Sequence, residues 1–366
     1  MTQALAKLQS DLYRLGSWLV GLSPRVFLLT FTLLAITKIA FIWRLPNVHG
    51  AAPAFPSPRE NSDLFLGILT YQVTGGNQVG YLLVGLLALV LSVLVIWLSG
   101  ERATALSATG RTRFILAVSW PLFITQFTWF GHGVEFLPLG IALAVLARSR
   151  ILQLLGVVIA AFAHPTQAFA AFFTLLVLTF APEFKRYRPI ASIATVVGAI
   201  VTIGFSVWIQ TAGIPSRIPL AVEVLPQSIL NALRHGILGL YSGWAVWWFV
   251  VLLAFVLVRG RSKIIVVITA VIFPSIATMI AWDGTRDFVA VAGAVGLALM
   301  AFVLNSSATQ DEGATNEAAR APGNFALALT AIVFVVLPNV QIMMIGDGIP
   351  EPGWMWVGLF ENYVLN

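Results

Sequence analysis

Long apolar runs separated by short polar turns constrain the fold of this chain more than any other feature. Of its 366 residues, 59% are hydrophobic and 10% are charged, and the mean hydropathy is +0.91. A soluble globular domain carries about 25% charged residues, so this composition excludes a soluble enzyme and a disordered chain. Because about 20 apolar residues cross a bilayer as a helix, the runs predict an all-α polytopic membrane protein.

About eleven transmembrane helices are predicted. They lie near residues 26–45, 80–99, 114–131, 136–148, 151–164, 165–182, 190–210, 237–258, 264–282, 288–304 and 325–344. The segments 136–148 and 151–164 are short for full spans, and the pair that meets at His164-Pro165 is compatible with a re-entrant hairpin as well as with two crossings.

The remaining segments complete the domain organisation. Residues 1–25 carry leucines at alternating spacings of three and four, which predicts an amphipathic helix at the membrane interface. The transmembrane core is expected over 26–304, and it includes two outer loops at 46–79 and 211–236. Residues 305–323 are small and polar and predict a flexible cytoplasmic linker. Residues 324–366 form the last span and an outer tail.

The distribution of basic residues predicts a cytoplasmic N-terminus. With that orientation, fifteen of the 21 Lys and Arg residues lie on the inner side and five on the outer side. Such a bias is the positive-inside signal of a multi-pass protein. The net charge of +6 therefore marks cytoplasmic loops, and no nucleic-acid partner is expected. All four histidines and nine of fifteen carboxylates fall on or near the outer side, where we expect any polar chemistry.

The first outer loop contains the first group of candidate site residues. Arg59, Glu60 and Asp63 precede a short apolar stretch that ends at Gly75-Gly76, a pattern typical of a surface helix. A carboxylate at its start can coordinate a metal or accept a proton from a hydroxyl, or it can simply complement the helix dipole.

Charged and polar residues inside or between the spans form the second group. Lys38 lies within the first span, where it can bind a lipid phosphate, snorkel to the interface or pair with an acid. His164 interrupts an apolar stretch and can act as a base or a hydrogen-bond donor, or cap backbone freed by Pro165. Arg286, close to Asp283 in the sequence, has a guanidinium suited to phosphate. A local ion pair in a tight turn is the alternative. His132 closes another outer turn.

Several function classes are excluded by what the sequence lacks. It has no cysteine, which rules out disulfides, thiol catalysis and thiolate metal sites. It also has no P-loop, GxGxxG or HExxH motif, and its cytoplasmic loops are too short for a nucleotide-binding domain.

Three features together resemble bacterial membrane glycosyltransferases of the GT-C type and the related EpsG- and Wzy-like polysaccharide polymerases. They are the acidic first loop before a surface helix, the run from Phe130 to Ala144 followed by His164-Pro165, and Asp283-Gly-Thr-Arg286 between late spans. The layout agrees over roughly residues 26–304. Two departures stand out: the first loop has no Asp-x-Asp, and His132 stands where the polymerases often have Arg.

The resemblance implies a GT-C-like fold and an enzyme of the bacterial plasma membrane. It would transfer a sugar from a polyprenyl-phosphate- or diphosphate-linked donor to a glycan or glycolipid acceptor at the extracytoplasmic face. Lys38, Arg59 or Arg286 would stabilise the charge of the leaving phosphate. Asp63 or His164 would deprotonate the acceptor hydroxyl. Apart from the resemblance, Glu60 is a further catalytic candidate, and Asp283 and His132 are further candidates for substrate binding. The resemblance implies no definite cofactor, and a divalent cation, Mg²⁺ or Mn²⁺, is compatible with it.

Two other functions compete with the transferase. The first is a transporter or a flippase for a lipid-linked glycan, although the predicted spans contain no Asp or Glu and the halves show no repeat. The second is a non-catalytic subunit of an envelope-assembly complex with protein partners.

Overall fold

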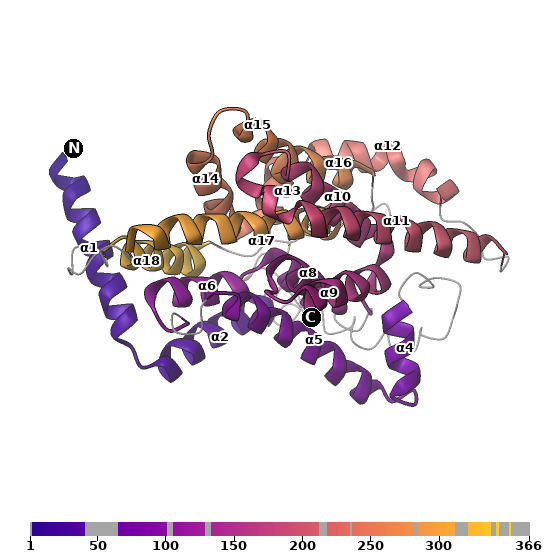
Figure 1. Ribbon diagram of the computed structural model, residues 1–366, viewed down its shortest axis with the longest axis horizontal. Helices are drawn as coiled ribbons and strands as arrows, with labels where there is room; N and C mark the ends of the chain where they lie inside the picture. The colour runs from indigo at the N-terminus through magenta and orange to yellow at the C-terminus, as the bar shows by residue number, and fades with distance from the viewer. Residues whose placement is uncertain are drawn as a thin grey trace.

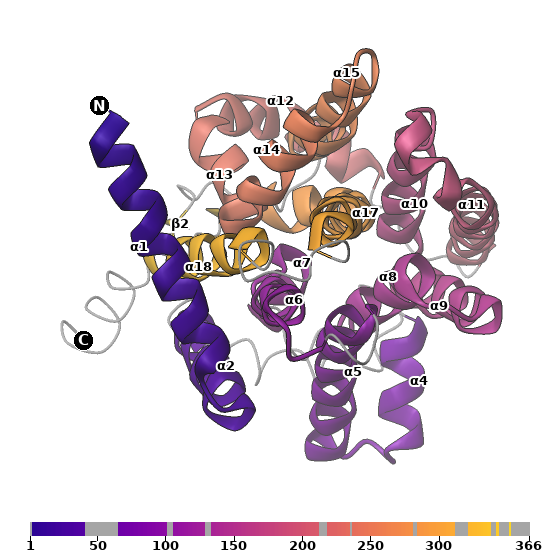
Figure 2. The same ribbon diagram turned by 60° about the vertical axis from the view of Figure 1, so that its left-hand side comes forward.

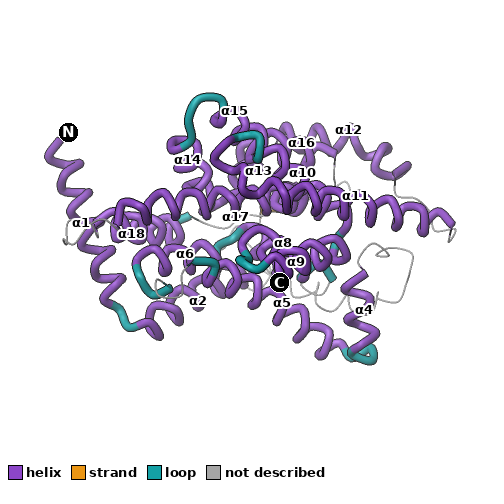
Figure 3. Tube along the Cα trace, viewed as in Figure 1, coloured by secondary structure: helices purple, strands orange, loops and turns teal. Residues whose placement is uncertain are grey.

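The chain folds into a bundle of helices in which most connections are short. The computed structural model describes residues 2–40, 65–100, 105–128, 133–211, 218–234, 236–280, 284–311, 321–337, 342–343 and 351–352. Figure 3 shows that nearly all of this part of the chain is helical. The all-α prediction is confirmed in these regions, apart from a two-residue antiparallel pairing of β1 (Ile342–Met343) with β2 (Glu351–Pro352).

The helices differ greatly in length. The first half of the chain contains α1 (Thr2–Gly21), α2 (Pro24–Ala40), α4 (Phe65–Val73), α5 (Gln78–Leu98), α6 (Ala108–Val118), α7 (Pro121–Thr128), α8 (Phe136–Leu146), α9 (Arg150–Ala163), α10 (Pro165–Leu178) and the 3₁₀ turn η3 (Pro182–Tyr187). The second half contains α11 (Arg188–Thr211), α12 (Ile218–Arg234), α13 (Gly236–Trp244), the 3₁₀ turn η4 (Ala245–Trp247), α14 (Trp248–Leu257), α15 (Ser262–Val267), the π-helical turn η5 (Ile268–Ile272), α16 (Phe273–Ile280), α17 (Gly284–Asp311) and α18 (Ala321–Val336).

The architecture is that of a multi-pass helical membrane protein, but the prediction of eleven spans is wrong. Within the described residues, five helical segments are long and apolar enough to cross a bilayer. They are Val79–Leu98, Pro182–Trp208, Gly239–Leu257, Ser262–Ile280 and Thr285–Ser306. A sixth arises if α1 and α2, which meet at a bend of 110°, count as one broken span.

Helix breaks explain the difference. The predicted span 114–131 is divided between α6 and α7, where Pro121 begins a new helix. The helices α9 and α10 have 14 residues each, so each is about 21 Å long at 1.5 Å per residue. A bilayer core is about 30 Å thick, and neither helix crosses it alone. Apolar content therefore predicted the membrane segments but not how many of them are long enough to cross a bilayer.

The helix α17 forms the centre of the bundle. In its most apolar stretch 83% of the residues are buried, against 22% in the segment that contains α11. Figures 1 and 2 show α17 along the middle of the molecule, with α7, α10 and α14 around it. The outward side of α11 instead exposes Val196, Ile200 and Ile203, as expected of a helix that faces lipid.

Two predicted local structures are confirmed, and two are longer than expected. A short helix, α4, follows the acidic first loop and ends before Gly75 and Gly76, whose φ angles of 65° and 76° favour glycine. The amphipathic N-terminal helix is present as α1, which packs on α18, and its interfacial position stays a prediction. The predicted outer loop 211–236 contains the helix α12, which begins at Ile218, and α17 extends to Asp311, into the predicted linker.

Helix breaks leave main-chain carbonyls without their usual donors, and buried side chains supply replacements. Pro274 has no N–H to offer the carbonyl of Ala270, four residues earlier, and the indole Nε1 of Trp244 donates to that carbonyl at 2.7 Å. Arg111 donates to the carbonyls of Leu19 and Leu22, at 2.6 and 2.8 Å, where α1 ends.

We predict that Trp244→Phe lowers the free energy of unfolding by about 1–3 kcal/mol, because the buried carbonyl of Ala270 loses its donor. Adding Pro274→Ala should recover most of this loss, since alanine restores the missing N–H. Trp18→Phe is the control, because Trp18 is 60% exposed. Thermal unfolding in lipid nanodiscs measures all four proteins, and equal losses for both tryptophan variants would contradict the assignment.

A second prediction concerns the close packing of α8 on α9. A methyl group added at Gly156 would lie 2.5 Å from the main-chain nitrogen of Ala144, so Gly156→Ala should cost about 1–3 kcal/mol. Gly204 on α11 has open space at the same point, and Gly204→Ala should be neutral or stabilising by about 0.5–1 kcal/mol. A tolerated Gly156→Ala would mean that the two helices do not pack in this register.

Candidate functional site

His164 occupies the break between α9 and α10. The helix α9 ends at Ala163, and α10 begins at Pro165, which suits a first helical position because it needs no N–H donor. The half-buried His164 caps α10, since its Nδ1 accepts a hydrogen bond from the main-chain N–H of Gln167 at 3.5 Å. The predicted break at His164 is confirmed.

A neutral imidazole has one protonated nitrogen. With Nδ1 accepting the bond from Gln167, the proton of a neutral His164 lies on Nε2, and an N–H group of that kind suits a phosphate or hydroxyl oxygen.

The two polar motifs around His164 and Arg286 meet in space, although about 120 residues separate them. Gln167 Nε2, near the start of α10, donates to Asp287 Oδ1, in the first turn of α17, at 3.2 Å. Further along, the rings of Phe184 and Phe302 are 5.2 Å apart, so the two segments run in the same direction. The amino ends of α10 and α17 thus lie side by side.

A third amino end, that of α8, lies at the same level. Each of Gly140 and Gly156 touches main-chain atoms of the facing helix, Gly140 at Ala160 and Gly156 at Ala144. Continued along this antiparallel register, the start of α8 lies at the level of the end of α9. The helix α8 also packs against α17.

Glu135 is a residue that the sequence analysis overlooked as a site candidate. It was counted as an outer-turn carboxylate, yet it is 1% exposed. Its side chain makes no capping hydrogen bond to α8. It interacts electrostatically with the phenol of Tyr81, itself 2% exposed, in the first turn of α5. The signal in the sequence was a carboxylate directly before an apolar helix.

We refer to the residues at these four helix starts as the amino-end cluster. Its members are Tyr81, Glu135, His164, Gln167, Arg286 and Asp287. Neighbouring side chains add hydroxyl groups, since Ser242 Oγ on α13 and Thr285 Oγ1 on α17 are 2.9 Å apart. Each helix start carries a partial positive charge, so four of them together with Arg286 make a region that favours anions.

Gln126 adds an amide at the junction of the same helices. It is 0% exposed on α7, which packs against α5, α8 and α17. Neither its Nε2 nor its Oε1 has a hydrogen-bond partner among the described residues. A buried amide with both ends unsatisfied costs free energy, so this position suits contact with a bound polar group.

Lys38 is occupied elsewhere in the fold. Its Nζ donates to the carbonyl of Phe334, and to that of Leu337 at 2.7 Å, at the end of α18, and lies over the ring of Phe334. Pro338 follows in the sequence and has no N–H to return to the carbonyl of Phe334. Lys38 therefore caps the end of α18. The sequence analysis predicted a lipid phosphate, the membrane interface or an acid as its partner, and not a helix end.

The other predicted site residues lie outside the described part of the chain. They are Arg59, Glu60, Asp63, His132 and Asp283. Within the described residues, no three His, Cys, Asp or Glu side chains are grouped to hold a metal ion.

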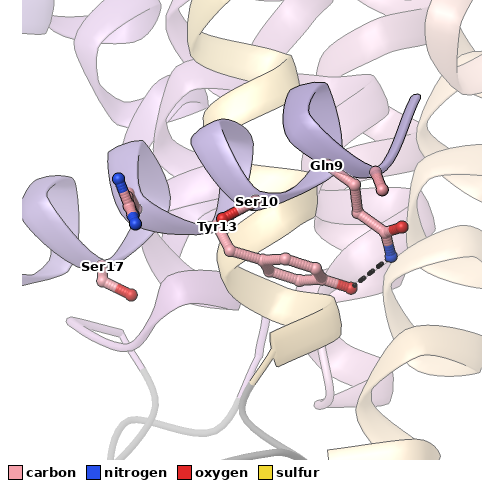
Figure 4. A pocket seen from close by; sticks show the side chains of 6 residues that line it. Gln9, Ser10, Tyr13 and Ser17 are labelled. Carbon is pink, nitrogen blue, oxygen red and sulfur yellow. Dashed lines mark hydrogen bonds between the residues drawn. The ribbon is translucent and has the colours of Figure 1, made fainter. Parts of the chain in front are cut away.

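Two hollows of the described structure lie away from the amino-end cluster. One of 540 Å³ is lined by residues of α1 alone, among them Gln9, Tyr13 and Ser17, and Figure 4 shows them along one side of that helix. Because one helix cannot enclose a ligand, this is a surface feature. Another, of 30 Å³ between α6, α14, α17 and α18, has room for little more than water.

The chain matches no protein-family model, no curated protein and no solved structure.

We predict energetic coupling between Gln167 and Asp287. In a double-mutant cycle with Gln167→Ala and Asp287→Ala, the interaction energy should be about 0.5–3 kcal/mol, because the bond joins a carboxylate to a buried amide. Pairing Gln167→Ala with Glu223→Ala, at an exposed site on α12, should be additive within about 0.5 kcal/mol. Denaturant unfolding in detergent measures both cycles, and additivity in the first would separate the two helix starts.

Proposed function

We propose that this protein is a bacterial plasma-membrane glycosyltransferase or polysaccharide polymerase. It takes its sugar from a polyprenyl-phosphate- or diphosphate-linked donor and passes it to a glycan or glycolipid. The observation that carries the proposal is the hydrogen bond between Gln167 and Asp287, which joins the starts of α10 and α17 and so brings His164 and Arg286 to one end of the bundle.

The charge pattern of this end suits the leaving group of such a reaction. When the bond between the sugar and the phosphate breaks, negative charge develops on the phosphate oxygen. The guanidinium of Arg286, the Nε2–H of His164 and the amino ends of α10 and α17 supply donors and positive charge for it. Because these groups are held by packed helices, they need little rearrangement as charge develops.

The basic residues support an extracytoplasmic location for the cluster. Arg113 lies in the middle of α6 and Arg148 follows the end of α8, and the like charge of Arg148 adds to burial in lowering the pKa of Arg113. With these basic residues on the cytoplasmic side, the amino-end cluster would face the extracytoplasmic side. A polyprenyl donor anchored among the exposed apolar helices would present its phosphate there. Arg59, Glu60, Asp63, His132 and Asp283 stay proposed contributors, with a Mg²⁺ or Mn²⁺ ion as the cation that the acids would hold.

A transporter or flippase for a lipid-linked glycan is the second candidate. The observation that favours it is the discontinuous α9–α10 segment, because transporters often bind anionic groups at the starts of broken helices. A third candidate, the non-catalytic envelope-assembly subunit, requires none of the cluster side chains.

We predict that deleting the protein makes a polyprenyl-linked sugar accumulate and removes a surface glycan. Complementation with Arg286→Ala, His164→Ala or Asp63→Asn should copy the deletion, and loss of one charge-stabilising donor should slow transfer about 100-fold. Arg261→Ala, at an exposed turn of the opposite end, should behave as wild type. Mass spectrometry of lipid extracts, with expression checked for each variant, measures the donor pool.

The outcomes separate the three candidates. An unchanged pool of lipid-linked sugars would reject the transferase. A pool that accumulates only on the cytoplasmic side of the membrane would favour the flippase. A glycan that is lost on deletion but fully restored by a variant with all three substitutions would indicate the non-catalytic subunit.

A further inference from the structure

Two turns beyond the far end of α10 from the amino-end cluster lie against each other. They are residues 180–188, which include η3, and residues 258–263, which join α14 to α15. Ser262 Oγ donates to Glu183 Oε2 at 2.7 Å, and the main-chain N–H of Arg259 donates to Glu183 Oε1 at 3.4 Å. Because these bonds join residues 79 and 76 positions apart in the sequence, they hold the two turns together as one surface.

The charge of this surface is strongly positive. The two turns contain six Lys or Arg residues and one carboxylate, that of Glu183. The Glu183 carboxylate is occupied by the hydrogen bonds that join the turns, and the charge of Arg259 lies close to it. One acid cannot neutralise six cations, so the two turns keep an excess of positive charge that attracts anions.

Aromatic rings position three of the cations beside apolar surface. The cation–ring pairs are Arg186 with Tyr187 at 4.7 Å, Arg188 with Phe180 at 5.7 Å and Lys263 with Phe255 at 5.2 Å. The ring of Phe180 is 63% exposed, and Ile264, directly after Lys263, is 62% exposed. Positive charge next to exposed apolar side chains suits a lipid with an anionic headgroup, because the headgroup and the chains are bound side by side.

We propose that this surface binds the phosphate of an anionic phospholipid through four side chains, which we call the basic patch. They are Arg186, Arg188, Arg259 and Lys263. The acyl chains of the lipid lie along the exposed side chains of Phe180 and Ile264. A basic turn on the predicted cytoplasmic side needs no such ligand, since topology alone favours Lys and Arg there. Topology does not require, however, that two distant turns be joined through Glu183 with their cations over aromatic rings. The site is independent of the proposed transferase function.

Native mass spectrometry of the full chain in detergent measures this binding. The wild type should bind phosphatidylglycerol more tightly than phosphatidylethanolamine with the same acyl chains, since the latter lipid has no net charge. A variant with all four patch residues replaced by Gln should bind phosphatidylglycerol about tenfold more weakly or worse, because each basic residue near an anionic lipid surface contributes about fivefold. The matched control has Gln at four exposed basic positions elsewhere and should retain wild-type binding; these positions are Lys7, Arg14, Arg25 and Arg150. Equal losses in the two variants would overturn the proposal.

Glu183 provides a test in which net charge and geometry predict opposite results. Glu183→Ala removes a negative charge, so attraction by net charge alone would strengthen the binding of phosphatidylglycerol. The same variant loses the bonds from Ser262 and Arg259 that hold the two turns together. We expect weaker binding, and stronger binding would overturn the proposal. Glu223→Ala removes the same charge from an exposed position on α12 and should leave the binding unchanged.

Competitors separate the lipid from other anions. Glycerol 3-phosphate has a phosphate group but no acyl chains, and at equal concentration it should not displace phosphatidylglycerol. A polyglutamate peptide should also fail to displace it. Displacement by glycerol 3-phosphate would indicate a site for free phosphate, displacement by the peptide would indicate an acidic protein partner, and either result would overturn the proposal. The combined variant Arg186→Lys, Arg188→Lys and Arg259→Lys keeps every charge and should retain the binding, so that loss in this variant as well would overturn the assignment to charge.

Discussion

Every main-chain carbonyl in an apolar bundle needs a donor, and this fold depends on side chains that supply donors where helices break. Four buried side chains donate hydrogen bonds to main-chain carbonyls at helix ends and breaks. Lys38 donates to the end of α18, Arg111 to the end of α1, Trp244 to Ala270 before Pro274, and Trp247 to Leu116 near the end of α6. An unsatisfied carbonyl costs several kcal/mol where no water can reach it. Because the donors come from distant parts of the sequence, each one also fixes how two helices pack.

The helix breaks give the molecule its polar end. A continuous helix would carry its amino end to the membrane surface, whereas the breaks at Pro165 and before α8 leave helix starts inside the bundle. The starts of α5, α8, α10 and α17 together place N–H groups and partial positive charge at one end of the bundle. The same feature that demands donors at carbonyl ends therefore creates an anion-favouring region at amino ends.

The sequence was sufficient for the class of fold and for the break at His164, because both depend on local chemistry: apolar length and the missing N–H of proline. The number of spans was not predictable from apolar content, since a run of apolar residues looks the same whether one helix or two short ones fill it. Glu135 was missed for a related reason. It is buried at the start of α8, and how closely α8 packs on its neighbours, as at Gly140 and Ala160, is a detail that no periodicity reveals.

Lys38 and Glu135 show why an ionisable residue in an apolar stretch needs its partners before it is given a role. Both are almost fully buried, and both are candidates by the usual argument from cost. For Lys38, two carbonyls at the end of α18 and the face of Phe334 compensate the cost of burying the charge, so this charge serves the fold. Glu135 lies at the start of α8 and interacts electrostatically with the buried phenol of Tyr81, and the partial positive charge of that helix start favours a carboxylate there. A region that favours a carboxylate also favours a phosphate, which is the property that the proposed sugar transfer requires of its site.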